Sequence, residues 1–166
     1  MKRILLFTFT TLLLFTLMAC GGGNKGDNEA ANALIIGSWA AQSPTVVTES
    51  GMTITLSDMT ATYAEDHTAK GSAKMSMSGA GLPAKLVMRM ATTSTWKIEG
   101  NQLKETITDV DLKMLTKIPG MPDMSGMIAQ GMKDEGEVTV TILKLDKNIF
   151  EFKDTDTGMQ VLMKRQ

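Results

Sequence analysis

Residues 137–152 read EVTVTILKLDKNIFEF, and this stretch shows the local pattern that decides the fold. Val138, Val140 and Ile142 alternate with threonines, which is the period of two expected of a strand with one buried face. A short polar turn at 146–148 follows, and a second apolar run begins directly after it. Two such runs joined by a short turn predict an antiparallel β-hairpin.

The same pattern recurs along most of the chain. Short runs rich in Thr, Val, Ile and Met are separated by turn residues. We expect strands at residues 36–40, 52–57, 60–65, 69–78, 85–91, 95–99, 103–112, 137–145, 149–153 and 159–164. Neighbouring strands joined by tight turns favour a mainly all-β, antiparallel up-and-down β-barrel of about 8–10 short strands, because closure removes exposed edges.

One long stretch, residues 116–136, departs from this pattern. It contains prolines, glycines and several methionines, and it shows no alternation. Asp123 or Ser125 is placed to cap a short helix running through Met127 and Met132. We therefore expect a long Met-rich loop with one or two helical turns, and loops of this length often form lids or binding segments.

The amino-terminal residues 1–19 have the layout of an export signal. Lys2 and Arg3 form a positive start, and the uncharged run that follows is too short and wrongly flanked to span a membrane. The run ends in Leu17-Met18-Ala19-Cys20, which resembles the lipobox of bacterial lipoproteins. This resemblance implies cleavage before Cys20 and attachment of lipid chains to it. Cys20 would then anchor the protein to a membrane.

Cys20 is the only cysteine, so no disulfide forms within one chain. Residues 20–33 are dominated by Gly, Asn and charge, which predicts a flexible tether, and residues 34–166 are long enough for one domain. Position 21 is Gly and not Asp. By the same resemblance this favours the outer membrane, with the domain facing the periplasm.

Three segments lie in the order typical of a known group. They are Gly37-Ser38-Trp39, residues 95–103 (TWKIEGNQL) and residues 142–152 (ILKLDKNIFEF). Together they resemble the bacterial lipocalin-like domains, a calycin-type group often found on lipoproteins. The resemblance implies a lipocalin-like barrel in which Trp39 plugs one end. It does not specify a ligand.

Little in the sequence points to catalysis or to nucleic-acid binding. The single histidine, His67, lies in a predicted turn, and the single thiol is the one that the resemblance implies is lipidated. A Ser-His-Asp or zinc constellation therefore lacks partners. Asp109 and Asp111 alternate along a strand, as expected of a solvated face. With no basic stripe or aromatic platform, we expect a protein that is not an enzyme and does not bind nucleic acid.

Methionine is abundant, with 15 residues, and two interpretations remain open. Methionine is a flexible apolar filler for cores and for pockets that adapt to lipid-like ligands. Its thioether is also a soft ligand that suits Cu(I), and Met121, Met124 and Met127 in the long loop form the candidate metal site.

The leading expectation is a lipid-anchored, non-catalytic barrel that binds a small hydrophobic molecule, with the Met-rich loop as its lid. The candidate lining residues are those with inward-facing spacing on three strands: Met75, Met77, Met88, Met90, Val138, Val140 and Ile142. The alternatives are a structural or protein-interaction lipoprotein of the envelope with a filled barrel, and a Met-rich periplasmic Cu(I) binder. The sequence does not identify a protein partner.

Overall fold

The computed structural model describes residues 25–49, 51–79, 82, 84–119 and 122–166. The expected export signal, Cys20 and Met121 lie outside the described residues. Two helices and nine strands form within them: α1 (Lys25–Ile35), β1 (Gly37–Ala41), β2 (Thr45–Glu49), β3 (Met52–Tyr63), β4 (Thr68–Gly79), β5 (Leu86–Glu99), β6 (Gln102–Met114), α2 (Ser125–Glu135), β7 (Glu137–Leu145), β8 (Ile149–Asp154) and β9 (Gln160–Arg165). Neither described helix is long and apolar enough to cross a membrane.

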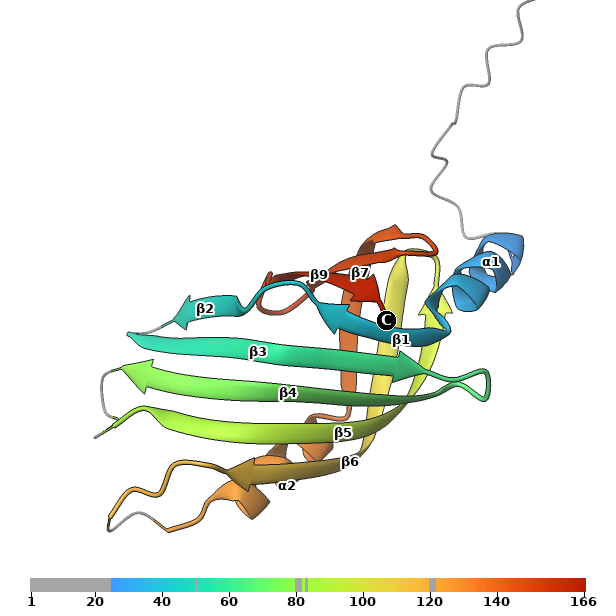
Figure 1. The fold of residues 1–166 in the computed structure, drawn as a ribbon. Helices are drawn as coiled ribbons and strands as arrows, with labels where there is room; N and C mark the ends of the chain where they lie inside the picture. The colour runs from blue at the N-terminus through green and yellow to red at the C-terminus, as the bar shows by residue number, and fades with distance from the viewer. Residues whose placement is uncertain (1–24, 50, 80–81, 83, 120–121) are drawn as a thin grey trace, which may run out of the picture.

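The strands form one closed antiparallel barrel with up-and-down connectivity (Figure 1). From β3 to β9 each strand pairs with the next, and β1 closes the circle by pairing with both β9 and β3. Eight strands therefore make the wall. The ninth, β2, follows β1 and pairs only with the first half of β3. The expectation of an all-β barrel is confirmed, although β2 was not predicted.

Two pairs of predicted strands are single long strands in the structure. The expected break at 58–59 is a register shift within β3, where Asp58 has a φ of 52°. Such a bulge inserts one residue and reverses which side chains face inward. Even-numbered residues such as Leu56 therefore face the interior before the bulge, and odd-numbered ones such as Met59 after it. The predicted break at 92–94 is likewise continuous strand within β5.

The Met-rich segment contains the expected helix. α2 begins at Ser125, and its N-cap is Met124 without a side-chain cap bond, so the expected cap at Asp123 or Ser125 is wrong. The Asp123 carboxylate instead accepts a hydrogen bond from the Ser125 backbone N–H at 2.9 Å. α2 packs against β6 because β7 pairs only with the Gln102–Thr106 part of that strand. The helix lies beside the half of β6 that β7 leaves without a partner strand (Figure 1).

The expected flexible tether is wrong for residues 25–33. These residues belong to α1, which packs on β5 and β7 and ends in Ile35, a fully buried side chain. The Asn28 side chain accepts a hydrogen bond from the backbone N–H of Gly100 at 3.0 Å. Composition suggested a loop because Gly and Asn are poor helix formers, but contacts with the barrel outweigh such weak preferences.

The barrel is closed tightly at the end that adjoins α1. Trp39 is fully buried there, and its indole N–H donates to the Ile35 carbonyl at 2.7 Å. Phe150 meets the Trp39 ring edge-on at 5.8 Å between centroids, and the Arg165 guanidinium lies 4.2 Å from the ring centroid. These contacts make this end a packed core rather than an opening.

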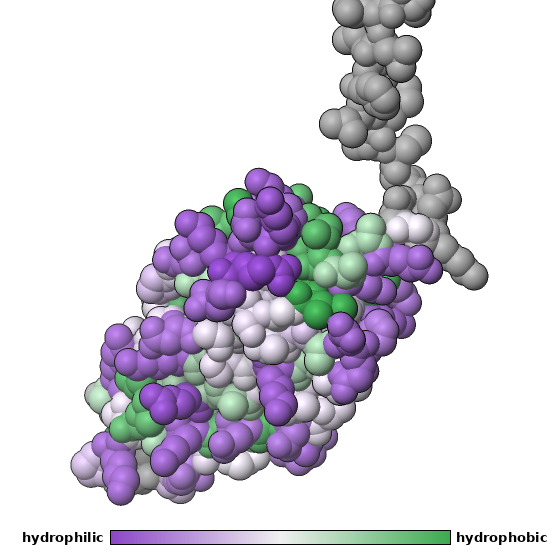
Figure 2. Space-filling view, turned by 45° about the vertical axis from the view of Figure 1, so that its right-hand side comes forward, coloured by the Kyte–Doolittle hydropathy of each residue, from purple (hydrophilic) through white to green (hydrophobic). Residues whose placement is uncertain are grey.

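The outer surface follows from strand alternation. On the face shown in Figure 2, hydrophilic side chains predominate and apolar areas are interrupted by them. The large apolar side chains that remain exposed in the described residues lie on several parts of the chain, two of them on β7: Val46, Leu115, Met127, Val138, Leu143 and Leu162. The remaining apolar side chains largely face the interior, where two cavities lie.

Candidate binding site in the barrel

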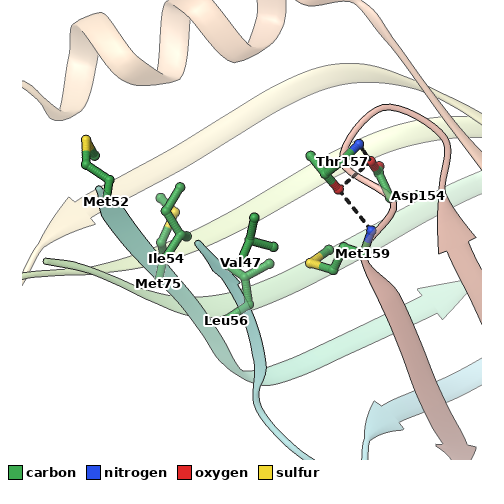
Figure 3. Close-up of a pocket in the computed structure, with 8 residues that line it drawn as sticks. All are labelled: Val47, Met52, Ile54, Leu56, Met75, Asp154, Thr157 and Met159. Carbon is green, nitrogen blue, oxygen red and sulfur yellow. Dashed lines mark hydrogen bonds between the residues drawn. The ribbon is translucent and has the colours of Figure 1, made fainter. Parts of the chain in front are cut away.

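A pocket of about 450 Å³ lies at the end of the barrel away from α1, and we call it the mouth pocket. Its residues come from β2, β3, β4, the end of β8 and the segment that joins β8 to β9 (Figure 3): Val47, Met52, Ile54, Leu56, Met75, Asp154, Thr157 and Met159. Most of them are apolar. The pocket forms where β2 continues from β1 without pairing to β9.

The floor of the mouth pocket follows from period-two alternation in β3. Met52, Ile54 and Leu56 face it, and Leu56 lies opposite Met75 of β4 in the antiparallel register. In that register Met75 in turn lies opposite Met88 of β5. Methionine side chains adapt to irregular shapes because they are unbranched and flexible. The wall of the barrel at this end therefore presents an adaptable apolar surface.

A hydrogen-bonded turn holds the other side of the pocket. Asp154 Oδ1 accepts hydrogen bonds from both the backbone N–H and the hydroxyl of Thr157, each at 2.7 Å (Figure 3). The Thr157 hydroxyl oxygen accepts the Met159 backbone N–H at 3.3 Å. Local bonds of this kind stabilise a turn without a regular ladder. They position Met159 at the pocket.

A second space of about 250 Å³, the inner cavity, lies deeper in the barrel. Asp154 and Met159 line both spaces, so the inner cavity and the mouth pocket adjoin each other there. The walls of the inner cavity are largely apolar and include Phe150 at the tightly packed end. Met132 of α2 also lines it, which brings the Met-rich segment to the cavity, and the role of this segment as a lid stays a prediction.

One polar cluster interrupts the apolar lining of the inner cavity. Glu105 of β6 accepts a hydrogen bond from the Tyr63 hydroxyl at 2.7 Å and one from the Ser94 hydroxyl at 2.8 Å. Tyr63 and Ser94 are both buried. Burial raises the pKa of Tyr63 well above its ordinary value, and the charge and hydrogen bond of Glu105 raise this pKa further. The phenol therefore keeps its proton and donates to the carboxylate.

The titration of Tyr63 gives a direct test of this cluster, because it is the only tyrosine in the chain. Folded protein holds the phenolic proton more tightly than unfolded chain does. Stability from this group is therefore complete below the ordinary pKa of about 10 and falls as the pH rises further. Near-ultraviolet tyrosinate absorbance should increase only together with loss of circular dichroism. Ionisation at the ordinary pKa in folded protein would contradict the burial of Tyr63, and Tyr63→Phe removes the absorbance change.

The structure divides the seven predicted lining residues among several positions. Met75 lines the mouth pocket, and three others line the inner cavity: Met90, Val138 and Val140. Met88 is buried in the wall with 1% of its surface exposed. Met77 is half-buried on β4, and Ile142 packs against the core cluster. The prediction that these side chains share the inward face is consistent with the strand register.

The candidate Cu(I) site is only partly within the described residues. Met124 directly precedes α2, and Met127 lies within that helix with 68% of its surface exposed. Met121 is not described, so a thioether site in this loop stays a prediction. In the described part of the chain, no three His, Cys, Asp or Glu side chains are grouped as a metal site.

The other candidate side chains lie at the surface. His67 is exposed at a positive φ of 62° in the β3–β4 turn, and its ring lies 4.7 Å from that of Trp96. Asp109 is exposed and lies 3.8 Å from the Lys133 ammonium of α2. Asp111 is exposed on the same strand. Asp109 and Asp111 therefore lie on the solvated face of β6, as expected.

Several lining residues were not predicted. The alternation of Met52, Ile54 and Leu56 with threonines is visible in the sequence and was a sufficient pattern to find them. Val47 was missed because β2 was not predicted. The sequence gives no signal that Glu105 faces inward, because a single charged residue in a strand is usually assigned to the solvent side.

No protein-family model matches the chain, and no curated protein matches its sequence. The functional argument therefore rests on the geometry and chemistry of the two adjoining cavities.

Proposed function

We propose that this protein is a lipid-anchored, lipocalin-like binding protein that takes up a small hydrophobic molecule without chemical conversion. The observation that carries the proposal is the apolar mouth pocket of about 450 Å³ that adjoins the inner cavity of about 250 Å³. Binding sites for small molecules are commonly concave, mostly apolar spaces of about 300–1,000 Å³ with few polar groups. The mouth pocket has this size and lining.

The expected affinity follows from burial of the ligand. Each methylene transferred from water contributes about 0.8 kcal/mol, so a chain of about ten carbons gains roughly 8 kcal/mol before the cost of association. That cost removes several kcal/mol, so a purely apolar ligand would bind only weakly unless a polar contact adds to the apolar gain. The methionine lining favours variable chain shapes over one rigid ligand.

The proposed anchor at Cys20 fits the position of α1. Only residues 21–24 separate Cys20 from Lys25, and an extended chain of this length spans about 18 Å at most. The tightly packed end of the barrel is therefore held near the bilayer. Strand β2 and the first half of β3, whose residues line the mouth pocket, lie at the end of the barrel opposite α1 (Figure 1), so we propose that ligand exchange occurs away from the anchoring membrane. The outer membrane, with the domain in the periplasm, remains the proposed location.

Adjacent residues of β2 offer a matched test of binding at the mouth pocket. Val47 lines the pocket, whereas 59% of the Val46 surface is exposed. Placing a carboxylate in an apolar pocket opposes entry of an apolar ligand. Val47→Glu should therefore weaken binding of the neutral fluorophore N-phenyl-1-naphthylamine about tenfold or more, and Val46→Glu should leave it within about twofold.

Fluorescence titration of the delipidated protein measures both affinities, with far-ultraviolet circular dichroism as the check on folding. Equal affinities for the two variants would contradict binding at the mouth pocket. A second measurement uses protein purified without added ligand. Organic extraction should release a hydrophobic molecule, whereas co-purifying proteins and an empty barrel would favour a structural role in the envelope.

A further inference from the structure

We propose that Glu105 is the recognition site for a protonated amine, so that the preferred ligand is an aliphatic amine whose ammonium group enters the inner cavity. This inference rests on the proposed binding function and adds the chemical class of the ligand. Among the described residues, two carboxylates line the inner cavity, and Glu105 is the one that does not also line the mouth pocket.

The strand register turns Glu105 inward. Leu103, Glu105 and Ile107 alternate along β6 and all three line the inner cavity. Glu105 lies opposite Trp96 on one neighbouring strand and opposite Val138 on the other. A charged side chain on an inward face is costly unless it is paired and hydrogen-bonded. Glu105 is half-buried, so a partner of opposite charge in the cavity would offset part of this cost.

The described part of the protein supplies hydrogen bonds to Glu105 but no ion pair, and Lys70, which also lines the inner cavity, is exposed. Oε1 accepts the Tyr63 hydroxyl and Oε2 accepts the Ser94 hydroxyl. A carboxylate has about four acceptor positions, so roughly two remain. None of the ion pairs within the described part of the chain includes Glu105. An ammonium group from a ligand would supply both hydrogen-bond donors and the missing charge.

The cluster is also rigid enough to select a ligand. The Tyr63 ring is held edge-on against Trp96 at 5.8 Å and against Phe150 at 6.2 Å. Ser94 has 3% of its surface exposed. Both donors are therefore fixed before the ligand arrives, which lowers the entropic cost of recognition.

The space around Glu105 accommodates the rest of such a molecule. Val140 and Met90 give the inner cavity apolar walls, and Met159 lies where this cavity adjoins the mouth pocket. An ammonium group at Glu105 places an alkyl chain along these walls toward the mouth. A fatty acid in the same orientation would bring its carboxylate against Glu105, and like charges repel.

Three ligands of equal chain length test the proposal: decylamine, decanol and decanoate. Their binding is measured by displacement of N-phenyl-1-naphthylamine from the delipidated protein. Wild-type protein should prefer decylamine over decanol by about tenfold or more, with decanoate weakest. Glu105→Gln should remove this preference, with each displacement referred to that variant's own affinity for the neutral fluorophore. Glu105→Asp, which keeps the charge, should retain part of the preference.

Glu137→Gln is the matched control, because Glu137 is an exposed carboxylate on the neighbouring strand β7. It should leave the preference for decylamine unchanged. Equal binding of the three ligands by wild-type protein, or an unchanged preference in Glu105→Gln, would overturn the role of Glu105. In both cases the proposed function would still be supported if Val47→Glu weakens binding of the fluorophore. Failure of the fluorophore to bind at all would instead reject the proposed function.

Lysophosphatidylethanolamine separates two sources of the ammonium group. It carries the same ammonium beside a phosphate, and the phosphate charge would be repelled by Glu105. We therefore expect it to bind less tightly than decylamine, which identifies a free amine as the ligand. If lysophosphatidylethanolamine binds as tightly as decylamine and Glu105→Gln abolishes this binding, ammonium recognition is supported. The source of the ammonium group is then a lipid headgroup.

Discussion

Replacing Trp39 with alanine is expected to lower the free energy of unfolding by about 3–5 kcal/mol, the range for removing a large aromatic side chain from a core. Trp39 has no exposed surface and loses its contacts with Phe150 and Arg165 on truncation. The substitution also leaves the Ile35 carbonyl without the indole N–H that bonds it at 2.7 Å. Small domains are stable by only about 5–15 kcal/mol, so this loss is a large fraction of the total.

Urea denaturation followed by circular dichroism measures the effect of Trp39→Ala. Leu143→Ala is the control, because Leu143 is an apolar residue with 48% of its surface exposed. Its substitution should change the free energy of unfolding by less than about 0.5 kcal/mol. A loss below about 1 kcal/mol for Trp39→Ala would mean that this end of the barrel is not tightly packed.

Arg165→Met is expected to cost about 3 kcal/mol, because three hydrogen bonds of about 1 kcal/mol each are lost. The Arg165 side chain donates to the carbonyls of Ile36 and Lys147, each at 2.6 Å, and to that of Leu34. It therefore ties β9 to the residues where α1 ends and β1 begins. Loss of its stacking on the Trp39 ring adds to the effect.

Arg165→Lys separates charge from geometry. A lysine ammonium has one nitrogen, whereas the planar guanidinium of Arg165 donates from three nitrogens to three carbonyls. Lysine therefore does not reproduce this geometry. We expect Arg165→Lys to lose at least half of the stability that Arg165→Met loses. Hydrogen exchange should accelerate in α1 for both variants and stay unchanged in β6. Wild-type protection of α1 in Arg165→Met would contradict this role.

Local pattern was a sound guide to the strands. The predicted strand at 137–145 has the same bounds as β7, because its alternation is uninterrupted and its ends carry turn residues. Pattern failed where the register changes. At the bulge near Asp58 the inward side chains change from even to odd positions, so the sequence resembles two strands where the structure has one.

The helix α1 and strand β2 show a different limit. Residues 25–33 are polar and contain Gly and Asn, and their helix depends on contacts with residues far away in sequence, such as Gly100. β2 is only five residues long and exists through its pairing with β3. Neither kind of contact leaves a periodic pattern in the local sequence.

The sequence predicted some residues of the candidate site and missed others. Alternation in β4, β5 and β7 placed Met75, Met90 and Val140 on the inward face, and each lines one of the two cavities. Nothing local distinguishes Glu105 from an outward carboxylate. Its inward direction follows only from its register with the neighbouring strands and from its bonds to Tyr63 and Ser94.

Gly37-Ser38-Trp39 shows how sequence and tertiary structure divide the information. The sequence by itself determined the all-β barrel, because alternation and turns act over neighbouring residues. The resemblance that this short motif carries implied Trp39 as the plug. Only the tertiary structure explains the glycine in that motif: Gly37 has a φ of +126°, and a Cβ there would lie 2.2 Å from the Arg165 guanidinium. The closed end, the docking of α1 and the orientation of Glu105 all depend on contacts between residues distant in sequence, which local pattern does not encode.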